Sequence, residues 1–294
     1  HEHLREDPVT VRRFANDARA LAKLNHPNIV QIYAAELGQY YFAMEHVEGP
    51  DLSKLIAESG AIATARAVAI GIQIADALAH IHRQGLVHRD VKPGNVLVSA
   101  GDRIKMTDFS IARESDETML TLKGSLIGTV EYMAPEQIRE EDTDLRVDIY
   151  AVGAVMYEML TGRSPFTRDA GSADLWPLME RILKENPIPL REINSSIPEP
   201  LAEVVSRSLA KSPADRPATM DEFIECLRAC AETTATIRIT PVALARPVEL
   251  PDGSARLAWT SASEPDFDRY EIHGSGGKDF VPSEQSLIEA VRER

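Results

Sequence analysis

Apolar residues recur along most of this chain at the helical spacing of about 3.6 positions. The pattern is clearest in 64–83, a predicted buried helix whose apolar face holds Ile70, Ile74, Leu78 and Ile81. The same reading predicts helices at 8–24, 51–59, 144–161, 173–184, 199–210 and 220–232. Runs rich in β-branched and aromatic residues predict strands at 29–35, 40–46, 96–98 and 104–106.

The pattern changes after Thr233. Alternating runs at 236–240, 255–260 and 269–273 are separated by Pro, Gly, Ser and Asp clusters, which indicates a β-rich module. We therefore predict two domains, 1–234 and 235–294.

The net charge of −14 argues against nucleic acid as a partner, because phosphate backbones require clustered Lys and Arg. No apolar run reaches the ~20 residues that span a bilayer, and the N-terminus lacks a signal-peptide core. These features predict a cytoplasmic chain without a membrane segment. Cys226 and Cys230 match no zinc or disulfide spacing and are interpreted as reduced thiols. The oligomeric state is left open.

One short segment carries most of the chemistry: His88-Arg-Asp-Val-Lys-Pro-Gly-Asn95. Asp90 offers a carboxylate near the proton of an acceptor hydroxyl, and Lys92 offers a cation to a phosphate. Asn95 supplies an oxygen ligand for a metal ion from the same loop. Asp108, further along the chain, supplies a carboxylate that can hold Mg²⁺.

These motifs, in this order, resemble the eukaryotic-type protein kinases, and most of all the bacterial Hanks-type Ser/Thr branch, over about residues 8–232. The resemblance implies an α+β kinase-like fold: mainly the helical C-lobe, with a partial N-lobe of one helix and two strands. It implies ATP and Mg²⁺ as cofactors and protein Ser or Thr hydroxyls as substrates.

The resemblance also assigns individual roles. Asp90 is implied as catalytic base, Lys92 as phosphate contact, and Asn95 and Asp108 as metal ligands. The implied cofactor-binding residues around the adenine hinge and beyond are Met44, Glu45, Val47 and Leu97, together with Asn95 and Asp108.

Structural and regulatory roles follow from the same resemblance. Glu136 is expected to pair with Arg216, and Asp148 to brace the backbone of the catalytic loop. Thr129 is expected near the floor that binds the acceptor. Arg89 is implied as the receiver of a phosphorylated activation segment, with Thr121 or Thr118 as the phosphosite. A solvated-loop interpretation of both threonines stays open.

Three departures from the family pattern qualify these expectations. No Gly-rich phosphate loop or strand lysine precedes the first predicted helix, so we interpret the chain as N-terminally truncated. Asp17 stands where that helix should present a glutamate to the lysine. Ser110 replaces the glycine after Asp108-Phe109, where a positive φ normally allows the segment to flip. We interpret Ser110 as a functional variant.

Leu257-Ala-Trp259 and Tyr270-Glu-Ile272 resemble the start of a fibronectin type III module, with the two aromatics as opposing core residues. An unrelated β-rich appendage is the alternative. For the whole chain, a pseudokinase or scaffold that binds partners through its helical lobe is the first rival to a Ser/Thr kinase. A small-molecule phosphotransferase is the second.

Overall fold

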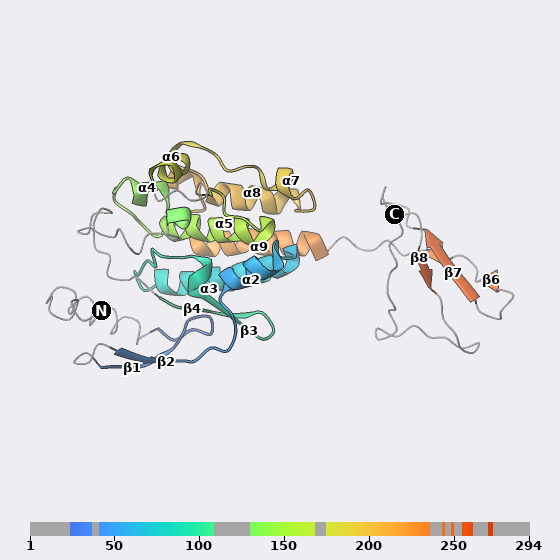
Figure 1. Ribbon diagram of the computed structural model, residues 1–294, viewed down its shortest axis with the longest axis horizontal. Helices are drawn as coiled ribbons and strands as arrows, with labels where there is room; N and C mark the ends of the chain where they lie inside the picture. The colour runs from blue at the N-terminus through green and yellow to red at the C-terminus, as the bar shows by residue number, and fades with distance from the viewer. Residues whose placement is uncertain are drawn as a thin grey trace. The chain divides into compact units, whose positions relative to one another are not determined.

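The computed structural model describes residues 24–36, 41–108, 130–167 and 175–235, and four short strands between 243 and 272. The chain divides into two compact units, His1–Thr234 and Ala235–Arg294 (Figure 1). The helix expected at 8–24 lies outside the described residues except for its last residue, Leu24, which is buried.

Two antiparallel hairpins form the β part of the first unit. Strands β1 (Ile32–Glu36) and β2 (Tyr41–Met44) pair with each other, and so do β3 (Val96–Ser99) and β4 (Arg103–Met106). The tight β3–β4 connection places Gly101 and Asp102 at positive φ, 74° and 55°. Glycine and aspartate tolerate that region better than most residues, which explains the turn.

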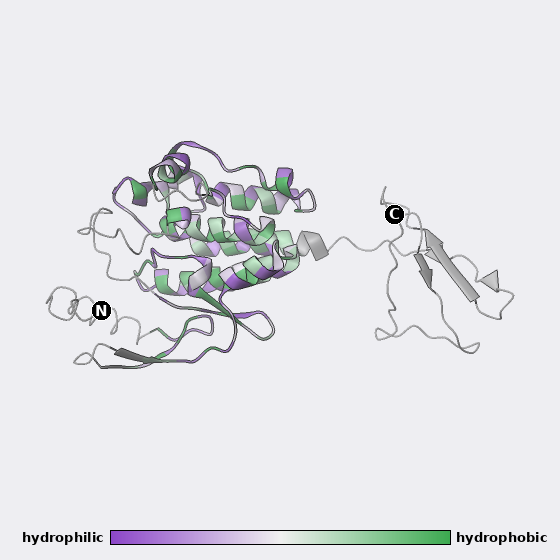
Figure 2. Ribbon diagram, viewed as in Figure 1, coloured by the Kyte–Doolittle hydropathy of each residue, from purple (hydrophilic) through white to green (hydrophobic). Residues whose placement is uncertain are grey.

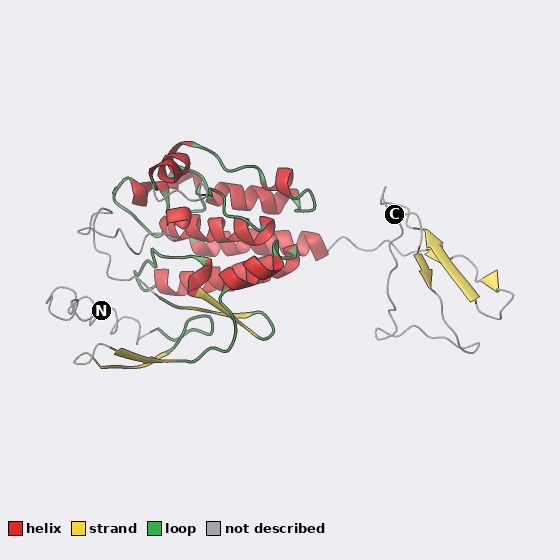
Figure 3. Ribbon diagram, in the orientation of Figure 1, coloured by secondary structure: helices red, strands yellow, loops and turns green. Residues whose placement is uncertain are grey.

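Helices make up the rest of this unit, as the red ribbons of Figure 3 show. The longer ones are α2 (Leu52–Ser59), α3 (Thr64–His82), α5 (Arg146–Thr161), α6 (Trp176–Lys184), α8 (Glu199–Ser208) and α9 (Met220–Ala235). The side chain of Asp51 accepts a hydrogen bond from the Lys54 N–H and so caps α2. Gly162, at φ 75°, ends α5 in the left-handed conformation that glycine favours.

Two single-turn helices, α4 (Pro135–Ile138) and α7 (Leu190–Ile193), were not expected from the sequence. A helix of one turn is too short to show a hydrophobic period, so the apolar spacing that predicts α3 predicts nothing at these two positions. The same holds for the two-residue strands β5 (Ala243–Leu244) and β6 (Val248–Glu249).

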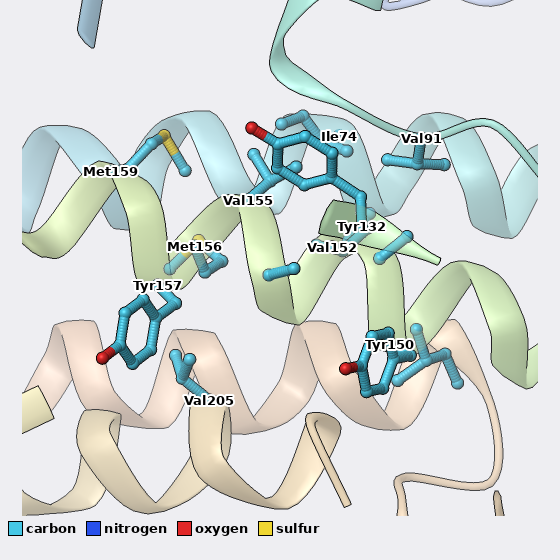
Figure 4. Packing of buried hydrophobic residues seen from close by; sticks show 14 of the residues in the cluster. Ile74, Val91, Tyr132, Tyr150, Val152, Val155, Met156, Tyr157, Met159 and Val205 are labelled. Carbon is cyan, nitrogen blue, oxygen red and sulfur yellow. The ribbon is translucent and has the colours of Figure 1, made fainter. Parts of the chain in front are cut away.

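Helix α5 is the centre of the core. It packs between α3 and α8, and nearly every one of its side chains is buried. Figure 4 shows Val155 and Met156 among side chains from both neighbours, and Figure 2 shows the apolar residues on these helices. Two glycines allow the close approach. A Cβ on Gly71 would lie 2.2 Å from the Met156 sulfur, and one on Gly153 would lie 2.1 Å from the Ser208 hydroxyl.

The second unit contains a small antiparallel sheet in which β7 (Ala255–Thr260) is central. It pairs with β5, β6 and β8 (Tyr270–Ile272), and Trp259 is the register partner of both Leu244 and Tyr270. The strand expected at 236–240 lies outside the described residues. Across the parts of the chain that the structure describes, no helix is both long and apolar enough to cross a membrane.

Candidate active site

The candidate active site begins with a buried carboxylate. Asp148, in the first turn of α5, is 0% exposed. Its Oδ1 accepts a hydrogen bond from the Arg89 N–H at 2.8 Å, and its Oδ2 accepts one from the His88 N–H at 2.8 Å. The Nε2 of His82, at the end of α3, lies 2.7 Å from the same Oδ2. One carboxylate therefore joins α3 and α5 to the backbone of the loop at 88–95.

This anchor holds the loop in an unusual conformation. Arg89 has a φ of 64°, a left-handed value that an arginine rarely adopts. Such strain persists only where surrounding contacts enforce it. Two contacts enforce it here. The Arg89 N–H donates to Asp148, and the Gln137 Nε2 donates to the Arg89 carbonyl at 3.3 Å.

Asp90 projects from this constrained backbone into a set of polar contacts. Lys92 Nζ lies 3.1 Å and 2.9 Å from its two carboxylate oxygens. The Nδ2 of Asn95 donates to the Asp90 carbonyl at 2.8 Å and to Oδ2 at 3.1 Å. The structure thus brings together three residues that the motif placed close in sequence, and it orients the Asp90 carboxylate from two sides.

His88 is fully buried, and its ring supports the backbone at Asp90. Its Nδ1 accepts a hydrogen bond from the Asp90 N–H at 3.3 Å. Burial lowers the pKa of His88 below its ordinary value, although the charges of Asp148 and Asp90 oppose this shift. A neutral ring is the form that can accept at Nδ1, so the lowered pKa and the observed contact agree.

Asn95 and Asp108 lie at the ends of adjacent segments. The Thr107 N–H donates to the Asn95 carbonyl at 3.0 Å, so Asn95 is bonded to the residue that directly precedes Asp108. Asp108 is exposed and has a φ of 55°. Among the described residues, no group of three or more His, Cys, Asp or Glu is placed to hold a metal ion.

The predicted hinge at 44–47 begins at Met44, the last residue of β2. Its Glu45 N–H donates to the Gln31 carbonyl at 2.8 Å, and Met44 is 48% exposed. Gly49 lies so close to β3 that a Cβ there would be 2.0 Å from the Val98 carbonyl oxygen. The Val98 N–H donates to the Pro50 carbonyl at 2.8 Å. These contacts join the segment that follows the hinge to β3, the strand that carries Leu97, and Asp51 forms a β-bridge with Leu97 itself.

A buried ion pair lies beside the catalytic loop. Arg216 donates to both carboxylate oxygens of Glu136, at 2.6 Å and 2.8 Å, and their side chains are 0% and 3% exposed. Arg216 also donates to the carbonyls of Ala210 and Arg146 at 2.9 Å and 3.0 Å. Glu136 precedes Gln137 on α4, so this pair also supports the helix that contacts Arg89.

Two further residues with buried side-chain contacts, His82 and Glu158, were not singled out in the sequence. His82 has the position of an ordinary helix-face residue, and only the fold shows its contact with Asp148. Glu158 of α5 accepts a hydrogen bond from the Tyr132 hydroxyl at 2.5 Å, and burial raises the pKa of this carboxyl. Tyr132 belongs to the short 3-10 turn at Val130–Tyr132. The position of Tyr132, three residues after Thr129 in the same motif, is the available signal.

Several predicted residues lie outside the described part of the chain: Asp17, Ser110, Thr118, Thr121 and Thr129. Their expected roles stay predictions.

Comparison with known proteins gives the family. A model of the protein kinase domain matches residues 2–226. The chain is 37% identical over 227 residues to a probable serine/threonine-protein kinase of Clostridium perfringens, covering 76% of this chain and 32% of that protein. It is 38% identical over 221 residues to the serine/threonine-protein kinase PrkC of Bacillus subtilis, covering 74% and 33%.

A third relative is the serine/threonine-protein kinase PknB of Mycobacterium leprae, 36% identical over 227 residues, with 75% of this chain and 36% of that protein covered. The crystal structure of Rad53 residues 1–466 in complex with AMP-PNP has a TM-score of 0.59 and 29% identity, covering 72% of this chain and 53% of that chain.

The chain belongs to the protein kinase domain family, in the bacterial Hanks-type serine/threonine branch. The kinase-like fold expected from the motifs is confirmed. The chain spans about a third of the length of these curated relatives. The fibronectin-like interpretation of the tail stays a prediction.

Proposed function

We propose that this protein transfers the γ-phosphoryl group of ATP to Ser or Thr hydroxyls of other proteins. The observation that carries the proposal is the Asp90 carboxylate, held by Lys92 and Asn95 on a loop that the buried Asp148 anchors. A base that must meet one hydroxyl needs this kind of fixed orientation. The names of the relatives, all serine/threonine-protein kinases, support the same activity.

In the proposed reaction, Asp90 accepts the proton of the acceptor hydroxyl as its oxygen attacks the γ-phosphorus. The bond from that phosphorus to the bridging oxygen breaks, and ADP leaves with the electron pair. Lys92 lies within 3.1 Å of Asp90, so its ammonium is close to the incoming phosphoryl oxygens and can balance their charge.

The donor set fits a magnesium ion carried by the nucleotide. Both described N–H contacts of the Asn95 amide go to Asp90, which leaves its Oδ1 as the ligand atom. Asp108 adds a carboxylate, and it directly follows Thr107, whose N–H is bonded to the Asn95 carbonyl. Mg²⁺ commonly takes one or two protein oxygens and completes its shell with phosphates and water. Bound there, it would neutralise the phosphate charge that develops during transfer.

The hinge at 44–47 is the proposed adenine site, together with Leu97 of β3. The AMP-PNP complex of Rad53 supports a nucleotide site in this fold. We further propose that residues 1–234 form the catalytic unit and 235–294 a separate module, and that the substrates are proteins. The net charge of −14 supports a partner other than nucleic acid.

The test is transfer of label from [γ-³²P]ATP with Mg²⁺ to a generic protein substrate, followed by identification of the labelled amino acids. Phosphoserine and phosphothreonine are expected, and Lys92→Met should lower kcat while the protein stays folded. Nucleotide binding without any transfer by the full-length gene product would favour the scaffold instead. Transfer to small metabolites only would favour the small-molecule phosphotransferase.

A further inference from the structure

An ion pair behind the hinge joins it to the strand that leads to Asp108. Lys105 lies in β4, three residues before Asp108, and its Nζ is 2.8 Å from Oε2 of Glu45 in the hinge. The same ammonium donates to the Ile29 carbonyl at 3.2 Å. Lys105 and Glu45, here called the hinge latch, have side chains that are 22% and 27% exposed.

The latch crosses a layer of three chain segments. Residues 28–31 lie between the hinge and β4, because the Glu45 N–H donates to the Gln31 carbonyl on one side. On the other side, the Val30 N–H donates to the Met106 carbonyl at 2.9 Å, and the Met106 N–H donates to the Asn28 carbonyl at 2.8 Å. Lys105 is the side chain that reaches over the middle segment and contacts the hinge.

Glu45 has a second partner. Its Oε2 accepts the Gln31 N–H at 3.2 Å, so one oxygen receives both a backbone donor and the Lys105 ammonium. Partial burial alone would raise the pKa of Glu45. The hydrogen bonds from Lys105 and Gln31 outweigh burial and lower that pKa, which keeps the carboxyl ionised.

We propose that the hinge latch is a positioning pair that sets the distance and orientation of the hinge relative to Asp108. This inference rests on the proposed function, since it assumes that adenine binds the hinge and that Asp108 binds the metal. The two latch side chains contact each other and the backbone of Ile29 and Gln31, whereas adenine is proposed to bind the backbone of the hinge. The effect of the latch is to pre-organise two ends of one site, so a ligand that uses both ends gains affinity from it.

A ligand that uses only one end should gain little. Adenosine engages the hinge alone, whereas Mg·ADP engages the hinge and Asp108 together. The experiment therefore compares the two affinities, by calorimetry, for the full-length protein and for Lys105→Met, Glu45→Gln and the double variant. Lys105→Met keeps the apolar stem and removes only the ammonium.

We expect each single variant to weaken Mg·ADP binding by about two- to fivefold and adenosine binding by less than about 1.5-fold. The double variant should be no weaker than either single variant, because both remove the same interaction. With Mg·ATP as substrate, KM should rise while kcat stays level. Arg83→Met, which breaks the cross-segment pair with Asp221, is the control and should leave both affinities unchanged.

Equal losses for adenosine and Mg·ADP would overturn the proposal, since the latch would then act on the hinge alone. Unchanged Mg·ADP affinity in both single variants would overturn it too, while leaving the kinase proposal intact. If the unaltered protein bound no Mg·ADP, both proposals would fail.

Discussion

The catalytic loop and the hinge are held in two different ways. The loop depends on Asp148, which is fully buried and bonded to two backbone N–H groups and a histidine. The hinge is exposed at Met44 and is held from behind by a pair of side chains that remain about a quarter exposed.

This difference separates two kinds of consequence. Removing one partner from a buried charged network leaves the other charge unsolvated, so damage near the loop should reduce stability and activity together. A partly exposed pair is screened by water, so damage at the hinge latch should change nucleotide affinity with little loss of stability. The following variants test how far this separation holds.

The largest expected loss is at the ion pair beside the loop. Arg216→Met leaves Glu136 buried without its bidentate partner and should lower the free energy of unfolding by about 3–5 kcal/mol. Urea denaturation of the full-length protein measures this loss. Arg146→Met is the matched control, because its partner Asp144 is about half exposed and the expected change is below about 1 kcal/mol. Similar losses in the two variants would remove the distinction between buried and exposed pairs.

A smaller loss of stability, with a clear loss of activity, is expected for Asp148→Asn. The amide has one acceptor oxygen for three donors, and its N–H₂ group faces other donors. We expect the free energy of unfolding to fall by about 1.5–3 kcal/mol and kcat to fall at least about tenfold. Asp144→Asn is the control. Full activity in Asp148→Asn would show that Arg89 keeps its strained conformation without this carboxylate.

Helix α5 carries both Asp148 and Gly153, so forcing it away from α8 tests the same support from a distance. In Gly153→Ala the new methyl would lie 2.1 Å from the Ser208 hydroxyl oxygen, and overpacking of this kind destabilises by about 1–3 kcal/mol. Thermal unfolding measures the change. Adding Ser208→Ala removes the hydroxyl and should recover part of the stability. No recovery would mean that the clash lies elsewhere.

The smallest effect is a pH dependence at Lys211. Burial lowers the pKa of its ammonium from 10.5 to about 8, with the Arg216 charge adding to the shift. Between these values the unfolded chain binds a proton that the folded protein has released, so this residue makes stability rise with pH. Lys211→Met lacks this titration. The difference in free energy of unfolding between wild type and variant should therefore move in favour of the wild type from pH 7.5 to pH 10.

A difference that stays constant with pH would show that Lys211 keeps its proton in the folded state. Its Nζ lies 4.3 Å from the centre of the Phe166 ring, and a cation–π contact of that kind favours the charged form.

The sequence predicted the long helices well, since a repeated apolar face is a local signal. Helix α3 was expected at 64–83 and spans Thr64–His82, and α5 was expected at 144–161 and spans Arg146–Thr161. The single turns α4 and α7 were missed because so few residues show no period. The register of β7 with its neighbours depends on pairing between separate segments, which a local pattern does not show.

For the site, spacing was informative only within the loop at 88–95. The sequence placed Asp90, Lys92 and Asn95 together because the motif is contiguous. The contacts of His82 with Asp148 and of Lys105 with Glu45 join residues 66 and 60 positions apart, and only the folded chain brings them together. His82 and Lys105 have no local sequence feature that distinguishes them from an ordinary helix residue and an ordinary strand residue.

The central claim is that Asp90 is the base of a phosphoryl transfer. Its most direct test is a single-turnover measurement of γ-phosphoryl transfer from Mg·ATP in the full-length protein and in Asp90→Asn, with the Mg·ADP affinity of both measured alongside. We predict a rate lower by about 10²–10⁴-fold in the variant, with the nucleotide still bound. An unchanged rate in Asp90→Asn would contradict the account.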